Sequence, residues 1–300
     1  MKRRCAIAGL VVAGAVSLLR ADDFTLHSDV RLVQLDVSVK DKKGEAVAGL
    51  DRSNFTVLEN GRPQTITVFG REDLPATLGI LVDESYSTRQ IRGSVLVAAE
   101  AFIGKCNTHD QFFVLNFNDR VVAGLPRSLP FSDNPAMLRS ALRHGNPEGM
   151  TALYDAIADG LKHVQLGQSH RRALVLISDG GDNASSHNRR EILQMVETIP
   201  ATIYTIGLFD ESDTETDKGL LKDLASISGG QAYLPKDSEE MLAACDRIAK
   251  DVRSRYTVGY VPSPDNGKGV RRIQVRVSAS GQGRLTALTR RSYSYGEKVH

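Results

Sequence analysis

Apolar and polar residues alternate near both ends of the chain. The stretch LDVSVK at residues 35–40 has a period of two, and so does RIQVRV at residues 272–277. Side chains that alternate in this way belong to strands with one buried and one solvated face. The stretch NFTVLENGRPQTITVF predicts two short strands about an Asn60–Gly61 turn, and the residues after Arg255 predict about three more strands.

The middle of the chain has a different pattern, in which apolar runs are continuous. The runs TLGILVD, QFFVLNF, RALVLISD and ATIYTIGL have the length and composition of strands that are covered on both faces. Apolar residues recur at helical spacing in the segments 91–103, 152–164, 189–199 and 238–252. This alternation predicts an α/β fold with a doubly wound, mainly parallel sheet and helices on both faces.

The two outer β segments are each too small to bury a core of their own. We therefore predict that residues 22–74 and 254–300 combine into one small antiparallel β-sandwich. An α/β domain at residues 75–253 would then be inserted between the two halves of the sandwich. The alternative is that two separate β segments flank the α/β domain and pack on it.

The first residues have the composition of a leader. MKRR is basic, and AIAGLVVAGAVSLL is apolar but short for a membrane span. Ala21 is a small residue of the kind found at a signal-peptide cleavage site. Residues 1–21 are therefore predicted to be a secretory signal peptide, with an uncleaved anchor as the alternative. The mature chain would be periplasmic or secreted to the extracellular space, and no later stretch is apolar enough to cross a membrane.

Charge and cysteine content change once the leader is removed. The formal net charge of +2 falls to −2 because four basic residues leave, and no basic run remains to suggest a nucleic acid partner. Of the three cysteines, only Cys106 and Cys245 are left. They could pair in an oxidising compartment, but Cys245 lies on the apolar stripe of residues 241–252, which favours two separate buried thiols. Neither cysteine has zinc-ligand spacing to a second Cys or His.

Oxygen-bearing side chains collect where the predicted strands end. Asp83 ends the first strand, Ser85 and Ser87 follow it, Asp179 ends the third strand, and Thr151 opens a helix. Ligands of open α/β sheets bind at the carboxyl ends of the strands. Two carboxylates and three hydroxyls, with no thiol or imidazole, suit a hard divalent cation such as Mg²⁺, with Mn²⁺ or Ca²⁺ as alternatives.

Each of these residues also has a purely structural interpretation. Ser87 and Thr151 could be helix N-caps, and Asp179 begins DGGDN, which is a turn sequence in its own right. The location of all five residues on loops at one edge of one sheet favours a shared site.

Three segments also resemble a known family. DESYS at residues 83–87 resembles the D-x-S-x-S motif of the von Willebrand factor A domain, GMTALYDAI resembles its threonine loop, and LISDGGDN resembles its aspartate loop. The resemblance covers roughly residues 77–252 in the family's order and ends in ASISGGQAYLPKDSEEM; Met150 stands where a glycine is common. The layout of the whole chain is similar to that of exported von Willebrand factor A-related proteins of acidobacteria.

This resemblance implies a metal-ion-dependent adhesion site. Ser85, Ser87 and Thr151 would coordinate the ion directly, and Asp83 and Asp179 would act mainly through water while they orient the hydroxyls. A protein partner would complete the site with the carboxylate of an aspartate or glutamate. With two carboxylates against a divalent ion, the site would be nearly neutral and able to accept one more anionic oxygen.

The sequence is compatible with three functions. The first is a non-enzymatic exported binding module. The second is a phosphoryl-transfer enzyme that uses Asp83, but Ser85 occupies the place of the acid that this chemistry needs, and no GK[ST] loop is present. The third is a structural module in which the ion only staples loops and the β-sandwich binds the partner.

The acidic segment Phe209–Gly219 is predicted to be a solvated loop, with a second, calcium-type site as its alternative.

Overall fold

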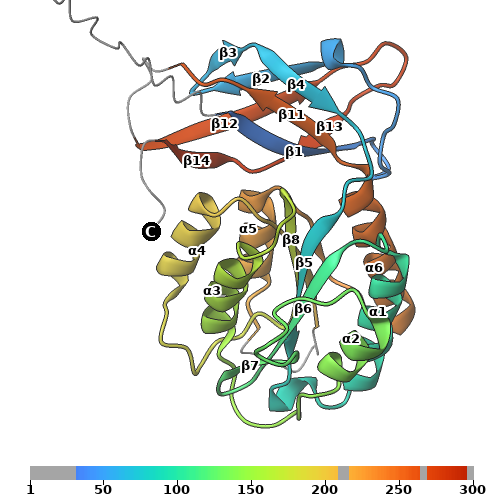
Figure 1. Cartoon of the computed structure of the whole chain (residues 1–300), viewed down its shortest axis with the longest axis vertical. Helices are drawn as coiled ribbons and strands as arrows, with labels where there is room; N and C mark the ends of the chain where they lie inside the picture. The colour runs from blue at the N-terminus through green and yellow to red at the C-terminus, as the bar shows by residue number, and fades with distance from the viewer. Residues whose placement is uncertain (1–31, 209–215, 264–268, 296–300) are drawn as a thin grey trace, which may run out of the picture. The chain divides into compact units, whose positions relative to one another are not determined.

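The computed structural model describes residues 32–208, 216–263 and 269–295. All of them belong to one unit of the chain, Arg31–His300 (Figure 1). The predicted signal peptide and most of the acidic segment Phe209–Gly219 lie outside the described residues.

A six-stranded sheet forms the centre of the α/β part of this unit, in the order β10-β9-β8-β5-β6-β7. Neighbouring strands are parallel except for β7, which runs antiparallel to β6. The strands are β5 (Ala76–Asp83), β6 (Gln111–Phe117), β7 (Val121–Ala123), β8 (Arg171–Ser178), β9 (Thr202–Gly207) and β10 (Ala232–Tyr233).

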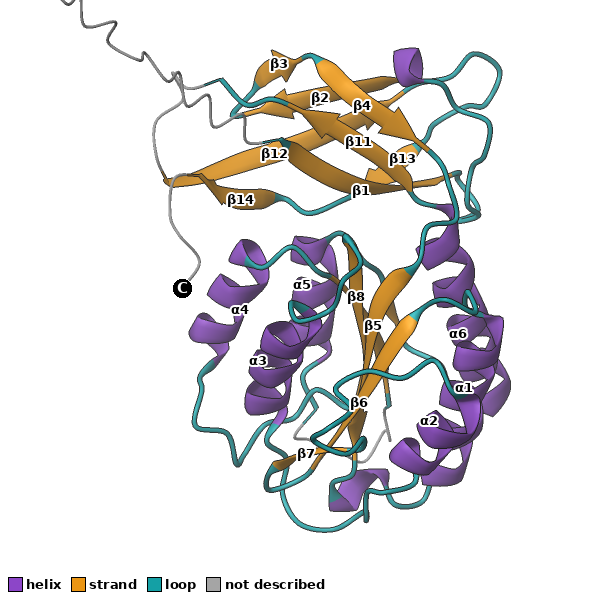
Figure 2. Ribbon diagram, viewed as in Figure 1, coloured by secondary structure: helices purple, strands orange, loops and turns teal. Residues whose placement is uncertain are grey.

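Helices cover both faces of this sheet (Figure 2). The helices on one face are α1 (Arg92–Lys105), α2 (Pro135–Leu142) and α6 (Ser238–Ser254). The helices on the other face are α3 (Leu153–Val164), α4 (Arg189–Thr198) and α5 (Lys218–Ser228).

The central strand β5 is buried along its whole length, which explains its continuous apolar sequence. Successive side chains point to opposite faces, so Ile80 packs in the core with α1 while Leu81 packs in the core with α3. Gly79 is needed for packing, because a Cβ at this position would lie 2.3 Å from Cζ of Phe113.

Two four-stranded antiparallel sheets flank the α/β part, in the orders β13-β1-β11-β4 and β14-β12-β2-β3. Each contains strands from both ends of the described chain, and their inner faces share one apolar core. Their strands are β1 (Val33–Lys40), β2 (Phe55–Glu59), β3 (Arg62–Gln64), β4 (Ile66–Gly70), β11 (Tyr256–Tyr260), β12 (Gly269–Val277), β13 (Thr286–Leu288) and β14 (Ser292–Tyr295).

The predicted fold class is confirmed, and the structure corrects its details. Asn60 and Gly61 have φ of 48° and 80°, as a tight turn between β2 and β3 requires. The segment predicted as two strands contains three, because the chain crosses after Gln64 to the other sheet as β4. The C-terminal segment contains four described strands instead of about three, because residues 285–295 split into β13 and β14. The α2 and α5 helices and the short β7 strand were not predicted, whereas β10 lies in the segment ASISGGQAYLPKDSEEM, which resembles the family's last strand and helix.

The α/β part and the two flanking sheets are in contact around one buried carboxylate. Asp251, near the end of α6, accepts hydrogen bonds from Ser38 of β1 and Tyr204 of β9. It also forms ion pairs with Lys40 of β1 at 2.6 Å and with Arg255 at 3.0 Å. Burial alone would raise the pKa of Asp251, but the charges of Arg255 and Lys40 hold it well below its usual range.

Cys106, which follows α1, and Cys245 of α6 are both free thiols. Burial raises the pKa of both, that of Cys245 to about 12, so the thiols are neutral and unreactive. Among the described residues, no helix combines the length and the apolar character needed to cross a membrane.

Candidate metal centre

The candidate site lies at the carboxyl edge of the six-stranded sheet. β5 and β8 are parallel neighbours, with Val82 beside Ile177, so the loops that follow them begin side by side. Asp83 is the last residue of β5, and Asp179 directly follows β8. This topology brings together two acids that are far apart in the sequence.

Asp83 is buried and held by two donors. Its Oδ1 accepts the backbone N–H of Ser85 at 2.9 Å, and its Oδ2 accepts the hydroxyl of Ser178 at 2.7 Å. Burial, together with the negative charge of Asp179, raises the pKa of Asp83 to about 7 despite these hydrogen bonds. The position therefore favours a compensating positive charge.

The two serines join the carboxylates. The Oγ atoms of Ser85 and Ser87 are 3.1 Å apart, and Ser87 donates to Oδ2 of Asp179 at 2.7 Å. The other oxygen of Asp179 accepts the N–H of Gly181 at 2.9 Å. Four of the five predicted site residues thus lie in one hydrogen-bonded group, connected through the Asp83–Ser85 turn.

Thr151 reaches the same edge from the segment before α3. Its N–H donates to Oδ1 of Asn183 at 2.8 Å, and its carbonyl accepts the N–H groups of Asn183 and Ala184. These contacts use the backbone of Thr151, whose side chain takes no part in them. Thr151 is therefore tied to the loop that carries Asp179.

Asp119, after β6, positions the residues just before Thr151. Its Oδ1 accepts the N–H of Met150 at 2.8 Å. Gly149 has φ of 78°, and a Cβ there would lie 2.3 Å from Oδ2 of Asp119. The carbonyl of Gly149 also accepts the N–H of Tyr86 at 3.3 Å, which joins the loop that carries Ser85 and Ser87 to the threonine loop.

A partly buried ion pair holds the start of the threonine loop. Glu84, 1% exposed, accepts Nε–H of Arg92 at 2.6 Å, and Arg92 also donates to the carbonyl of Gly145 at 2.7 Å. The carbonyl of Glu84 accepts the N–H of Glu148 at 3.0 Å. Burial raises the pKa of Glu84, although the charge of Arg92 opposes this shift. Glu84 therefore connects loops and does not face solvent.

Sequence reasoning missed most of these supporting groups. Asn183 is visible in the DGGDN turn, but its partner Thr151 lies 32 residues away. Ser178, Asp119 and the Glu84–Arg92 pair stand in ordinary strand, turn and helix positions. Only the tertiary contacts identify them.

The donor set fits a hard divalent cation. Carboxylate and hydroxyl oxygens are the ligands that Mg²⁺ and Ca²⁺ accept, and Asp83 and Asp179 supply two negative charges. Within residues 32–208, 216–263 and 269–295, no group of three or more His, Cys, Asp or Glu is placed to hold a metal ion. Any ion at this edge would therefore depend on the hydroxyls of Ser85, Ser87 and Thr151.

Comparison with known proteins agrees with this fold. Residues 78–181 match the family model of the von Willebrand factor type A domain. A solved structure described as von Willebrand factor type A from Catenulispora acidiphila matches with a TM-score of 0.53 and 11% identity, over 90% of this chain and 76% of that one. Proximal thread matrix protein 1 from the mussel byssus matches with a TM-score of 0.52 and 16% identity, over 65% of this chain and 51% of that one. No curated protein sequence matches this chain.

At these identities the solved structures establish a shared fold only. The family match covers the strand that ends at Asp83, the threonine loop and the start of the aspartate loop. The six-stranded α/β part therefore has the fold of a von Willebrand factor type A domain, and residues 78–181 match the model of that family.

Proposed function

We propose that this chain is an exported, non-enzymatic binding module that uses a divalent cation to capture an acidic side chain of a protein partner. Asp83, Ser85, Ser87, Thr151 and Asp179 would hold the cation, with Mg²⁺ as the first choice and Mn²⁺ or Ca²⁺ as alternatives. The observation that supports this proposal is the group of neighbouring oxygens that runs from Asp83 through the two serines to Asp179.

The residues have distinct roles in this proposal. A bound divalent ion offers a coordination position to an additional anionic oxygen. The hydroxyls of Ser85, Ser87 and Thr151 are the direct ligands. Asp83 and Asp179 orient them, and the hydrogen bond from Ser87 to Asp179 is an example of this orientation.

The rim of the site suits a protein partner. Tyr86 is 68% exposed and Met150 is 52% exposed, and the two residues lie on loops that the Tyr86–Gly149 backbone hydrogen bond joins. Aromatic and Met side chains are enriched at protein interfaces. A carboxylate presented among apolar neighbours would match this surface.

The same proposal includes the organisation of the chain. A signal peptide at residues 1–21 would direct the protein to the periplasm or the extracellular space. Residues 22–74 and 254–300 would form the β-sandwich, and residues 75–253 the von Willebrand factor A domain.

The alternative is that the ion only staples the loops and the β-sandwich binds the partner. The contacts at the site weigh against a need for such a staple. Asn183 already joins the threonine and aspartate loops, and Arg92 already joins α1 to the threonine loop.

The deciding experiment is calorimetric titration of residues 22–300 with Mg²⁺, Mn²⁺ and Ca²⁺. We expect saturable binding that Asp83→Ala and Thr151→Ala abolish while both variants keep a native circular dichroism spectrum. Asp159→Ala, an exposed acid of α3, is the matched control and should bind normally.

A second titration tests the carboxylate. With the cation present, a glutamate-containing peptide should bind and its glutamine counterpart should not. Cation binding without peptide binding would favour the staple alternative, and absence of cation binding in the unmutated protein would overturn the proposed site.

A further inference from the structure

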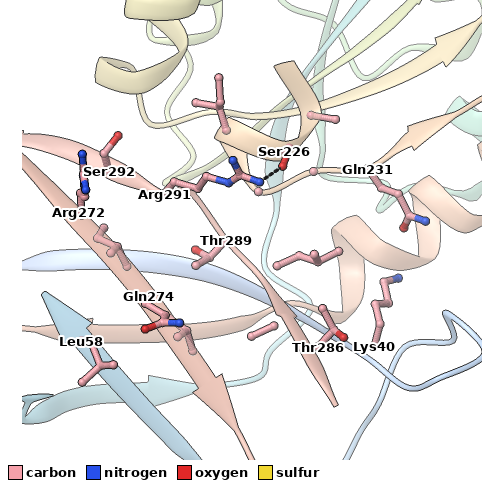
Figure 3. Close-up of a pocket in the computed structure, with 18 of the residues that line it drawn as sticks. Lys40, Leu58, Ser226, Gln231, Arg272, Gln274, Thr286, Thr289, Arg291 and Ser292 are labelled. Carbon is pink, nitrogen blue, oxygen red and sulfur yellow. Dashed lines mark hydrogen bonds between the residues drawn. The ribbon is translucent and has the colours of Figure 1, made fainter. Parts of the chain in front are cut away.

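A second candidate site lies away from the candidate metal centre, between the sandwich strands and the α5 side of the α/β part (Figure 3). It is an open cleft of about 1690 Å³. One wall contains β12 and β14 residues such as Arg272 and Ser292, and the opposite wall contains α5 residues such as Lys222 and Ser226. All of its lining residues are described and belong to the unit that contains both sheets.

Basic side chains outnumber acidic ones around this cleft. The basic ones are Lys40, Lys42, Lys222, Arg272 and Arg291, and the acidic ones are Asp41 and Glu197.

Two of the five basic groups are already engaged. Lys40 is bound to Asp251 at 2.6 Å, and Arg291 donates to the hydroxyl of Ser226, as the dashed line in Figure 3 marks. Lys42, Lys222 and Arg272 are exposed, and none of them forms an ion pair within residues 32–208, 216–263 and 269–295. Asp41 and Glu197 form no ion pair among these residues either, but Arg291 keeps its charge because its partner Ser226 is neutral. The cleft therefore has a net positive charge although the chain as a whole is close to neutral, and this favours an anionic ligand.

The cleft also contains the edge of a β-sheet. β13 is the terminal strand of its sheet and pairs with β1 on one side, as Ala287 does with Val39. All three residues of β13, Thr286–Leu288, line the cleft. An edge strand presents backbone N–H and C=O groups that an extended peptide can pair with.

From these two features we infer that the cleft binds an extended acidic segment of a protein partner, which adds a strand to the open edge of β13 while its carboxylates face Lys42, Lys222 and Arg272. The edge supplies main-chain hydrogen bonds, and the basic side chains select for acidic residues at alternate positions, since alternate side chains of a strand share a face. An acidic polysaccharide could interact with the basic side chains but could not form main-chain hydrogen bonds with the edge of β13. The site needs no cation, so it is independent of the candidate metal centre.

The probe is a fluorescent peptide of about ten residues with alternating glutamate and threonine, titrated into residues 22–300 in EDTA and followed by anisotropy. EDTA removes any contribution from a divalent cation at Asp83. We expect binding that weakens as NaCl rises from about 50 to 300 mM, because exposed charge pairs are screened. The glutamine counterpart should bind about tenfold more weakly, and so should a peptide with alternate backbone amides methylated.

The variant Lys222→Glu/Arg272→Glu should lower the affinity by about tenfold or more, because two attractions become repulsions. Arg276→Glu is the matched control, since Arg276 is an exposed residue of the same strand but does not line the cleft. Both substitutions are on the surface, so thermal unfolding should show the same midpoint as the unmutated protein.

Several results would overturn the inference. These are no peptide binding in EDTA, equal weakening by Arg276→Glu and by the double variant, and unchanged affinity of the methylated peptide. Binding of dextran sulfate alone would show that the cleft takes a polysaccharide and not a peptide.

Discussion

At the scale of single residues, Gly149 is the position in the threonine loop where both the backbone conformation and the neighbouring Asp119 disfavour a side chain. A Cβ there would meet Asp119 at 2.3 Å, and φ of 78° is a conformation that L residues rarely adopt. We expect Gly149→Ala to lower the free energy of unfolding by about 2 kcal/mol and to weaken cation binding, because the carboxylate of Asp119 must turn away and release the N–H of Met150. Gly44→Ala has the same kind of φ, 81°, but nothing within 4 Å, so it should cost only about 1 kcal/mol. Equal losses in urea unfolding would show that the contact with Asp119 has no role.

Ser178 is the second single residue on which the site depends. Its hydroxyl donates to Asp83 at 2.7 Å and accepts the N–H of Gly180 at 3.1 Å, and the residue is fully buried. Ser178→Ala leaves two buried groups without a partner, so we expect a loss of about 2 kcal/mol in the free energy of unfolding. Cation affinity should fall by about tenfold, since Asp83 loses the group that orients it. A variant with normal stability and normal cation affinity would contradict this role.

At the scale of elements, the Glu84–Arg92 pair joins the end of β5, the first turn of α1 and the loop before Thr151. Replacing Arg92 with Met leaves a buried carboxylate without its cation, and we expect a loss of about 2 kcal/mol, reduced because Arg92 is 21% exposed. The double variant Arg92→Met/Glu84→Gln should recover part of this loss.

The matched control for this prediction is Arg143→Met. Arg143 also pairs with a glutamate, Glu100, at 2.9 Å, but its side chain is 63% exposed. Its loss should be about 0.5 kcal/mol or less. If urea unfolding gave both single variants the same small loss, the Glu84–Arg92 pair would be no more than a surface contact.

At the scale of the whole described unit, Asp251 joins the sandwich to the α/β part. Asp251→Asn leaves Lys40 and Arg255 without their shared carboxylate, so we expect a loss of about 3 kcal/mol at pH 7. Asp246→Asn is the control on the same helix, because Asp246 pairs with Lys105 and Lys250 at the surface, and it should cost less than about 1 kcal/mol.

The Asp251 contribution also has a defined pH dependence. The folded-state pKa of Asp251 lies below its unfolded value near 3.8, so the charge network stabilises the fold fully above about pH 4. This stabilisation is lost as the pH falls further, through the folded-state pKa. The difference between the unmutated protein and Asp251→Asn should therefore be constant from pH 7 to about pH 5 and shrink below pH 4 in urea unfolding. A difference that shrank between pH 7 and pH 5 would contradict the assignment.

Local patterns predicted much of this structure because the information they carry is local. Continuous apolar runs identified β5, β6, β8 and β9, and the Asn60–Gly61 pair identified the turn between β2 and β3. The short α2 helix escaped prediction because its apolar stripe, residues 138–142, covers little more than one turn. The break between β13 and β14 was not predicted, because Arg290 and Arg291 fit the pattern of one continuous strand.

Part of the candidate site could likewise be predicted from the sequence, and part of it could not. Asp83, Ser85 and Ser87 are neighbours in sequence, and their place at the end of a buried strand was readable from the pattern. Their hydrogen bonds to Ser178 and Asp179 span more than ninety residues and depend on β5 and β8 being adjacent. The roles of the five residues as cation ligands stay a prediction until the titration is made.

The types and order of the main elements, the α/β class and the residue types of the candidate site follow from local patterns, because periodicity and motifs act over a few residues. The pairing of strands and of distant charges is visible only once the chain is folded. Ser38 reaches Asp251 across 213 positions, and Tyr260 reaches Glu59 across 201. Such contacts follow from how whole faces pack to bury apolar area, and no local pattern records which distant residue will supply the partner.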